Sequence, residues 1–222
     1  MRKLKLSITE SYLVDLVHSQ LNNHFPDQHK IKIKTLLHCI KNGIYRIQRC
    51  FDSIVLKYYG QADLSFFNHL HGDHYAMFLY FVSNEAYLAN DEILASKLFL
   101  LNKSLFGIDA FYSIKLPEHF LFVHPLGTVL GNADFGDFFV VYQGVTIGST
   151  TEGIYPTFSS STILYSNSSI IGNCHISENF VLGANATLVN TDISADKVVI
   201  GNYPNFSILE NKNKLISNYF KI

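Results

Sequence analysis

The chain has 222 residues, of which 48% are hydrophobic and 16% are charged, and its formal net charge at pH 7 is −1. A protein that binds a phosphate backbone needs clustered lysine and arginine, so this composition gives no support for a nucleic-acid partner. Its apolar stretches fall far short of the roughly 20 residues that span a bilayer, so we expect no membrane span. Three cysteines without metal-ligand spacing argue against a disulfide framework and indicate a cytoplasmic protein.

Residues 1–107 show apolar residues at helical spacing and are expected to form an α-helical domain. Ser7 and Glu10 have the spacing of a capping box, which predicts a helix start there. The spacing predicts further helices around 36–47, from about 73 to 88, and from there to about 105. Gly107 suits the C-cap of the last helix.

After Gly107 the helical spacing gives way to a period of six. A large aliphatic or aromatic residue recurs at Ile108, Ile114, Phe120, Phe135, Val141, Ile147, Phe158, Leu164, Ile170, Ile176, Leu182 and Leu188. This period fits neither an α-helix nor an alternating strand, and it indicates a parallel β-helix in which each short strand and turn takes one hexad.

We therefore expect a β-helix domain over residues 108–206, with residues 149–156 looped out of the coil. Glycines follow many of the inward positions, and we expect them to form tight corners: Gly136, Gly148, Gly183 and Gly201. Residues 207–222 form a C-terminal tail that we expect to pack back on a coil.

Two segments of the coil resemble a known family. His124-Pro-Leu-Gly-Thr-Val-Leu-Gly131 and Val141-Tyr-Gln-Gly-Val-Thr-Ile-Gly148 are similar to the serine acetyltransferase branch of the hexapeptide-repeat acyltransferases, and residues 192–202 resemble its closing coil. The likeness covers roughly residues 63–206. It implies a left-handed β-helix, a homotrimer, and acetyl-CoA held in a groove between neighbouring coils. The left hand follows from the resemblance alone, because parallel strands otherwise favour right-handed crossovers.

The resemblance implies a general base. The family's histidine in the element His-x-x-Gly-x-Val-x-Gly is matched by His124, and the aspartate that the family places fifteen residues earlier is matched by Asp109. An imidazole can take the proton of an acceptor hydroxyl or amine near neutral pH, and a carboxylate on its other ring nitrogen fixes the tautomer. Asp109 could equally be a turn residue that caps the first coil.

A second polar cluster contains His69, His71, Asp73 and His74. Its spacing does not meet the rules for a zinc site, so we expect no metal. The cluster could simply be the polar start of a helix, where Asp73 is favourable beside the helix dipole. Alternatively it lines an acceptor pocket, because related transferases use this segment beside the catalytic histidine, and His71 and Asp73 are then the candidates.

Small and polar residues at the coil edges are the candidates for binding acetyl-CoA, because they let the pantetheine arm approach the backbone. They are Gln143, Thr146, Gly148, Ser149, Gly183, Ala184 and Asn202. Each could equally be an ordinary turn residue. No cluster of lysine and arginine marks a site for the CoA phosphates.

The loop after the Gly-Val-Thr run bears on the acceptor. Serine acetyltransferases place an arginine and a second histidine before its proline, whereas this chain has Ile154-Tyr155-Pro156. A missing cationic anchor weakens carboxylate binding, and Tyr155 could stack on a sugar or pack on Phe158. We therefore expect acetyl transfer to a sugar hydroxyl or amino group, free or nucleotide-linked, in bacterial surface polysaccharide biosynthesis. The alternatives are serine O-acetylation for cysteine biosynthesis and a non-catalytic trimeric scaffold.

Overall fold

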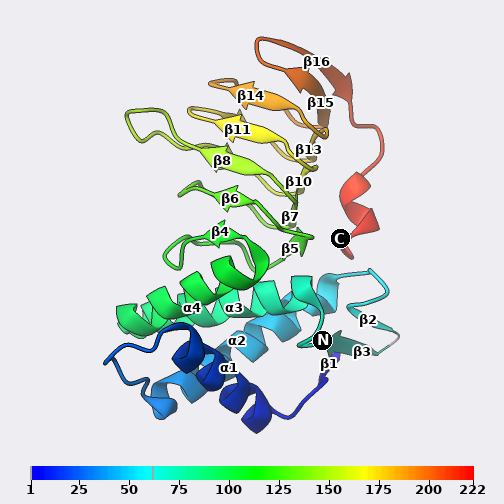
Figure 1. Cartoon of the computed structure of the whole chain (residues 1–222). Helices are drawn as coiled ribbons and strands as arrows, with labels where there is room; N and C mark the ends of the chain where they lie inside the picture. Colours follow the sequence, from blue (N-terminus) through cyan, green and yellow to red (C-terminus); the bar gives the residue numbers. More distant parts are fainter. Residues whose placement is uncertain (1, 62) are drawn as a thin grey trace.

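A block of helices lies beneath a stack of β-coils in the computed structural model, which describes residues 2–61 and 63–222 (Figure 1). The four predicted helices are confirmed as α1 (Glu10–His24), α2 (Ile33–Ser53), α3 (Gly72–Leu88) and α4 (Glu92–Phe106). Gly107 caps α4 with left-handed backbone (φ 64°), as predicted, and its N–H donates to the Lys103 carbonyl. None of the helices in the described part of the chain has both the length and the apolar character needed to cross a bilayer.

The start of α1 differs from the predicted capping box. Thr9 is the N-cap, and its side chain accepts a hydrogen bond from the Tyr12 N–H. Ser7 Oγ instead accepts from the His69 N–H at 3.0 Å. Ser7 follows a small sheet of order β1-β3-β2 that the helical pattern did not predict, formed by β1 (Lys3–Leu6), β2 (Gly60–Gln61) and β3 (Leu64–Phe67). Strands of two to four residues are too short to show alternation in the sequence.

The second half is a parallel β-helix with three faces, as the six-residue period predicted. The first face contains β5 (Phe120–Val123), β7 (Phe139–Tyr142), β10 (Thr162–Leu164), β13 (Phe180–Leu182) and β15 (Lys197–Asn202). The second face contains β4 (Asp109–Ala110), β6 (Val129–Leu130), β8 (Thr146–Gly148), β11 (Ser169–Ile171) and β14 (Thr187–Val189). The third face contains β9 (Thr157–Phe158) and β12 (His175–Ile176).

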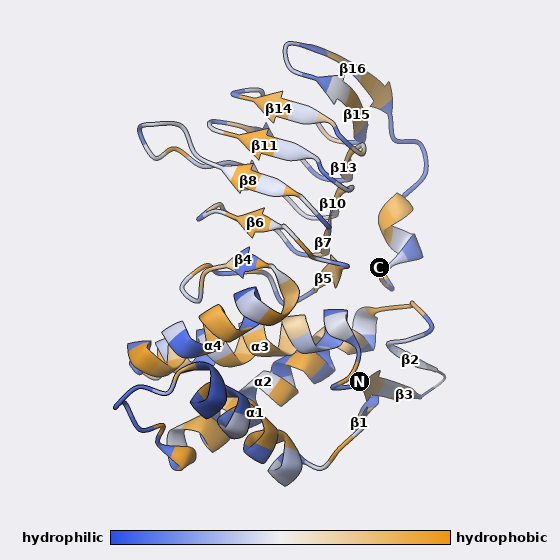
Figure 2. Ribbon diagram, in the orientation of Figure 1, coloured by the Kyte–Doolittle hydropathy of each residue, from blue (hydrophilic) through white to orange (hydrophobic). Residues whose placement is uncertain are grey.

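The core of the coil is formed by the predicted inward residues. From Ile108 to Leu188 they are buried, with Phe135 only partly so. Figure 2 shows apolar residues recurring on the strands of successive coils, with polar residues in the turns between them. Residues 149–156 leave the coil as a loop, as predicted. Each coil therefore buries its large side chains on those of the coils above and below.

Asparagine provides left-handed backbone at several corners in addition to glycine, which was not predicted. Positive φ angles occur at Asn167, Asn179, Asn185 and Asn190. Of the four glycines expected to shape the corners, only Gly201 has a positive φ (89°). Gly136 is needed for space instead, because a Cβ there would lie 2.4 Å from the backbone carbon of Ser159.

The C-terminal tail connects the coil to the helices. After β15 the chain forms the antiparallel strand β16 (Asn205–Glu210) and a short 3₁₀ helix, η1 (Leu215–Asn218). The hydroxyls of Tyr219 and Tyr142 are 2.7 Å apart, so the tail contacts the first face. The Lys221 N–H donates to the Ser53 carbonyl at the end of α2. The tail therefore bridges the two halves of the molecule.

Truncating a core residue of the coil tests this packing. Leu182 in β13 is fully buried, and we expect Leu182→Ala to lower the free energy of unfolding by about 2–5 kcal/mol through lost transfer energy and a residual cavity. The matched control is Leu88→Ala at the end of α3, where the side chain is 63% exposed and the change should stay within about 0.5 kcal/mol. Denaturant unfolding at one fixed protein concentration measures both, and equal losses would contradict the assigned core.

Candidate active site

His124 follows β5 at the corner between the first and second faces of the coil. Its backbone is left-handed (φ 50°), which is uncommon for a residue with a side chain. Its side chain is 78% exposed. The corner therefore presents the imidazole on the surface, where a substrate can reach it.

The chain leading to His124 is fixed by hydrogen bonds from α3. The Tyr80 hydroxyl donates to the Ile114 carbonyl at 2.7 Å and accepts from the Leu116 N–H at 2.9 Å. The Asn84 amide donates to the Tyr112 carbonyl at 2.8 Å. These groups are buried, where an unmade hydrogen bond costs about 1–3 kcal/mol, so the segment before β5 is held firmly on the helix.

Asp73, in the first turn of α3, is the carboxylate that contacts His124. Its Oδ1 accepts a hydrogen bond from the His124 backbone N–H at 3.1 Å and lies 3.9 Å from the ring Nδ1. The Asp73 side chain is only 12% exposed. Burial raises the pKa of Asp73, and the nearby His124 and His71 and the hydrogen bond from His124 oppose that rise. Asp73 was predicted as an acceptor-binding residue, and its contact with the predicted base was missed.

Asp109, the predicted partner of His124, has a different neighbour. It begins β4, and its Oδ2 accepts from the Lys103 ammonium at 2.6 Å. Its backbone N–H donates to the Thr128 carbonyl. The pairing of Asp109 with His124 stays a prediction.

The remaining histidines of the second cluster have structural contacts. His69 Nδ1 is 2.8 Å from Ser7 Oγ, and the rings of His71 and His74 stack at 4.1 Å between centroids. His74 is fully buried, and burial lowers its pKa to about 3, so its ring is neutral. Within residues 2–61 and 63–222, His, Cys, Asp and Glu side chains form no group of three that could hold a metal ion. The role of His71 in binding the acceptor stays a prediction.

The predicted acetyl-CoA residues lie along both edges of the second face. Val123 pairs with Tyr142 and Leu164 pairs with Leu182, so the residues that follow these strands occupy one corner of the coil. This corner carries His124, Gln143, Gly183 and Ala184. Thr146, Gly148 and Ser149 lie on β8 and just beyond it, and Asn202 pairs with Thr187 beside β14. The assignment of these residues to acetyl-CoA stays a prediction.

Tyr155 packs against the coil. A Cβ on Gly131 would lie 2.4 Å from Cε1 of Tyr155, so the ring lies directly over that glycine. The Thr150 N–H donates to the Ile154 carbonyl at 3.0 Å and closes the loop. The ring therefore packs on the coil at Gly131, and the role of Tyr155 in binding the acceptor stays a prediction.

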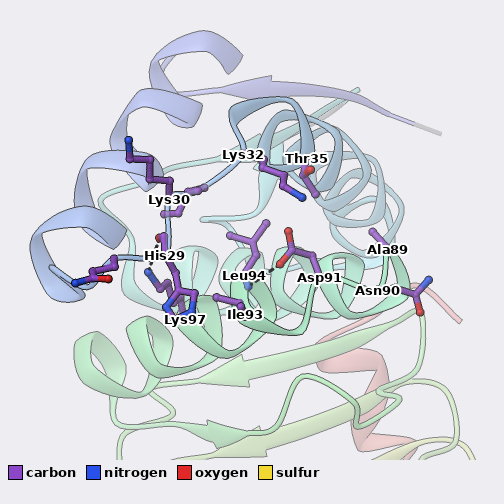
Figure 3. A pocket seen from close by; sticks show the side chains of 12 residues that line it. His29, Lys30, Lys32, Thr35, Ala89, Asn90, Asp91, Ile93, Leu94 and Lys97 are labelled. Atoms are coloured by element: carbon purple, nitrogen blue, oxygen red, sulfur yellow. Dashed lines mark hydrogen bonds between the residues drawn. The ribbon is translucent and has the colours of Figure 1, made fainter.

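A cavity of about 520 Å³ lies within the helical block and is separate from this site (Figure 3). Lys30 and Lys32 line it from the segment before α2, and Asp91 and Lys97 line it from the N-terminal part of α4. The Lys97 ammonium is already paired with Asp27 at 2.7 Å. None of the predicted site residues lines this cavity, so the cavity is not part of the site at His124.

Comparison with known proteins connects this geometry to a family. No family profile matches the chain. A serine acetyltransferase of Synechococcus elongatus is 30% identical over 105 residues, which make up 46% of this chain and 43% of that protein. The chain thus matches less than half of the length of that curated relative.

Solved structures match over most of the chain. The serine acetyltransferase of Neisseria gonorrhoeae in complex with serine has a TM-score of 0.65 at 20% identity, covering 85% of this chain and 81% of that one. The serine acetyltransferase of Brucella abortus in complex with coenzyme A has a TM-score of 0.67 at 14% identity, covering 93% of this chain and 84% of that one. The resemblance to the serine acetyltransferase branch is confirmed. The left-handed β-helix that it implied is confirmed with it.

The same relatives correct one expectation. We expected a sugar acceptor and a place in polysaccharide biosynthesis because the loop at Ile154-Tyr155-Pro156 lacks the family's cationic residues. Serine acetyltransferases match this chain both among the curated sequences and among the solved structures. The sugar acceptor is therefore wrong, since a single departing loop is weaker evidence than the sequence similarity to serine acetyltransferases.

The cysteines are expected to be unreactive in the folded protein. All three are free and buried, and burial raises the pKa of Cys39 to about 11 and that of Cys50 to about 12. Burial raises the pKa of Cys174 as well. Because the thiolate is the reactive form, a disulfide reagent such as DTNB should label the native protein slowly and all three thiols after denaturation. Rapid labelling of the native protein would contradict this burial.

Proposed function

We propose that the chain is an acetyl-CoA-dependent serine O-acetyltransferase of cysteine biosynthesis, in the cytoplasm, with His124 as its general base. The observation that carries the proposal is the position of His124. It lies exposed at a corner of a coil whose solved structural relatives bind serine and coenzyme A. The carboxylate of Asp73 is buried beside His124. Its negative charge stabilises the imidazolium that forms when His124 takes up a proton.

The reaction needs only one proton carrier. The serine hydroxyl oxygen attacks the thioester carbonyl carbon as its proton passes to the imidazole of His124. The carbon–sulfur bond then breaks, and the imidazolium returns the proton to the CoA thiolate. Transfer is direct, and the buried cysteines take no covalent part in it.

Acetyl-CoA is proposed to lie along the second face, with the thioester at the corner that carries His124. Gln143 follows one coil later at that corner, and its buried Oε1 has no hydrogen-bond partner within the described chain. An amide N–H of the pantetheine arm would satisfy this oxygen. Gly148 and Gly183 have no side chain, and Ala184 has only a methyl group. The pantetheine arm therefore has room to approach the backbone at these positions.

The site is proposed to be completed by neighbouring copies in a homotrimer. Two residues after His124, Leu126 is 71% exposed, and Leu70 near the start of α3 is 82% exposed. A catalytic residue on an open surface beside exposed leucines is typical of a site that forms at a subunit boundary. The leucines would then be covered in the assembly.

Removing the base tests the proposed function. We expect His124→Ala to lower kcat/KM for serine by about 10²–10⁴-fold, measured by CoA thiol release, because the proton carrier is lost. The melting temperature should change little, since the side chain is exposed. The matched control is His175→Ala, an exposed histidine on the third face, which should keep wild-type turnover. Unchanged turnover in His124→Ala would contradict the assignment, and a wild-type protein that releases no CoA with serine would favour the scaffold alternative.

A further inference from the structure

We propose that Asp73 is the positioning residue of the active site: it holds the backbone of His124 and stabilises the ring when the ring carries the transferred proton. This role rests on the proposed function of His124. It gives Asp73 a task distinct from acceptor binding.

The hydrogen bond to the backbone is the first part of the argument. His124 adopts left-handed backbone, which a residue with a Cβ adopts only at a cost. Asp73 Oδ1 accepts from the N–H of this residue at 3.1 Å. Asp73 itself lies in the first turn of α3, a helix that is buried along most of its length and therefore a rigid support.

The same chain shows twice how such a contact extends to the ring. Asp137 accepts from the backbone N–H of His119 at 2.8 Å and lies 2.8 Å from its Nδ1. Asp192 contacts the N–H of His175 at 2.9 Å and its Nδ1 at 2.8 Å. Asp73 already makes the backbone half of this arrangement with His124. Its Oδ1 is 3.9 Å from the ring nitrogen, so the carboxylate lies next to the ring but is not hydrogen-bonded to it.

The environment of Asp73 makes its charge effective. Three titratable groups face it: His71 at the N-cap of α3, His124 from the coil, and the fully buried Tyr59 hydroxyl. Tyr59 is neutral because burial raises its pKa well above the usual value. A carboxylate held in a poorly solvated position interacts more strongly with an imidazolium than one in water. Asp109 is less suited to this task, because it is more exposed and already faces the Lys103 ammonium.

Two substitutions separate the two tasks of Asp73. Asp73→Asn keeps an oxygen for the His124 N–H and removes the charge, whereas Asp73→Ala removes both. We expect Asp73→Asn to lower kcat by roughly 10²-fold and to change the serine KM by less than about threefold, because the charge acts on the protonated ring. Asp73→Ala should lose at least as much. The matched control is Asp192→Asn, which removes the same charge beside His175 and should leave kcat unchanged.

Two comparisons would overturn the role of Asp73. If Asp109→Asn lost as much activity as Asp73→Asn, Asp109 would be the partner of the base. If Asp73→Asn raised the serine KM and spared kcat, Asp73 would bind the acceptor. In the background of His124→Ala, Asp73→Asn should add little further loss, because residues that act as a unit are not additive.

Two readouts do not depend on turnover. The amide proton of His124 should exchange with solvent faster in Asp73→Ala than in the wild type and should not change in Asp192→Asn, because only Asp73→Ala removes the oxygen that accepts from this N–H. Burial raises the pKa of Asp73, so its ionised form weakens the fold as pH rises through that pKa. Asp73→Asn should therefore be no less stable than the wild type at neutral pH.

These readouts keep the two proposals apart. Faster exchange of the His124 amide in Asp73→Ala, in a protein that does not acetylate serine, would support the role of Asp73 and reject the proposed acceptor. An active enzyme whose His124 amide exchanges at the same rate in Asp73→Ala would reject the role of Asp73 and leave the proposed function intact.

Discussion

The packing of α3 against the segment before β5 is the interaction on which the site depends. Tyr80 and Asn84 use buried hydrogen bonds to fix residues 112–116, and Tyr80 also meets the ring of Phe120 edge-on at 5.5 Å between centroids. The same helix carries Asp73 in its first turn and so places a carboxylate beside His124. A stack of coils alone would present the imidazole to water without a charged partner. The helical block therefore supplies the carboxylate of Asp73 that lies beside His124.

The coil contributes regular spacing. Parallel pairing between successive coils puts equivalent positions in register, so His124 and the later corner residues lie along one edge. Narrow coils leave little room for functional groups inside, and chemistry is confined to corners and faces. The C-terminal tail holds the other side of the junction, where Tyr219 contacts the first face and its carbonyl accepts from the Val55 N–H. The coil and the helical block are thus joined at two places, along α3 and at the end of α2.

The sequence was sufficient to predict the coil and the helices, because both depend on periodic burial of large side chains. The hexads from Ile108 to Leu188 and the C-cap at Gly107 are signals of that kind. The contact between Asp73 and His124 could not be predicted, since 51 residues separate them and only the docking of α3 brings them together. The small sheet was missed because its strands are too short to show a pattern. The preference for a sugar acceptor failed because it inferred specificity from one loop, in which Tyr155 is occupied with packing on Gly131.

The most direct test is a crystal structure of the protein with both coenzyme A and serine bound. The proposed chemistry predicts that the CoA sulfur and the serine hydroxyl meet at the corner of His124, with the hydroxyl about 3 Å from a ring nitrogen and Asp73 on the other side of the ring. It also predicts a second copy of the chain against that corner. Coenzyme A bound in the cavity of the helical block, or on the coil away from His124, would contradict it.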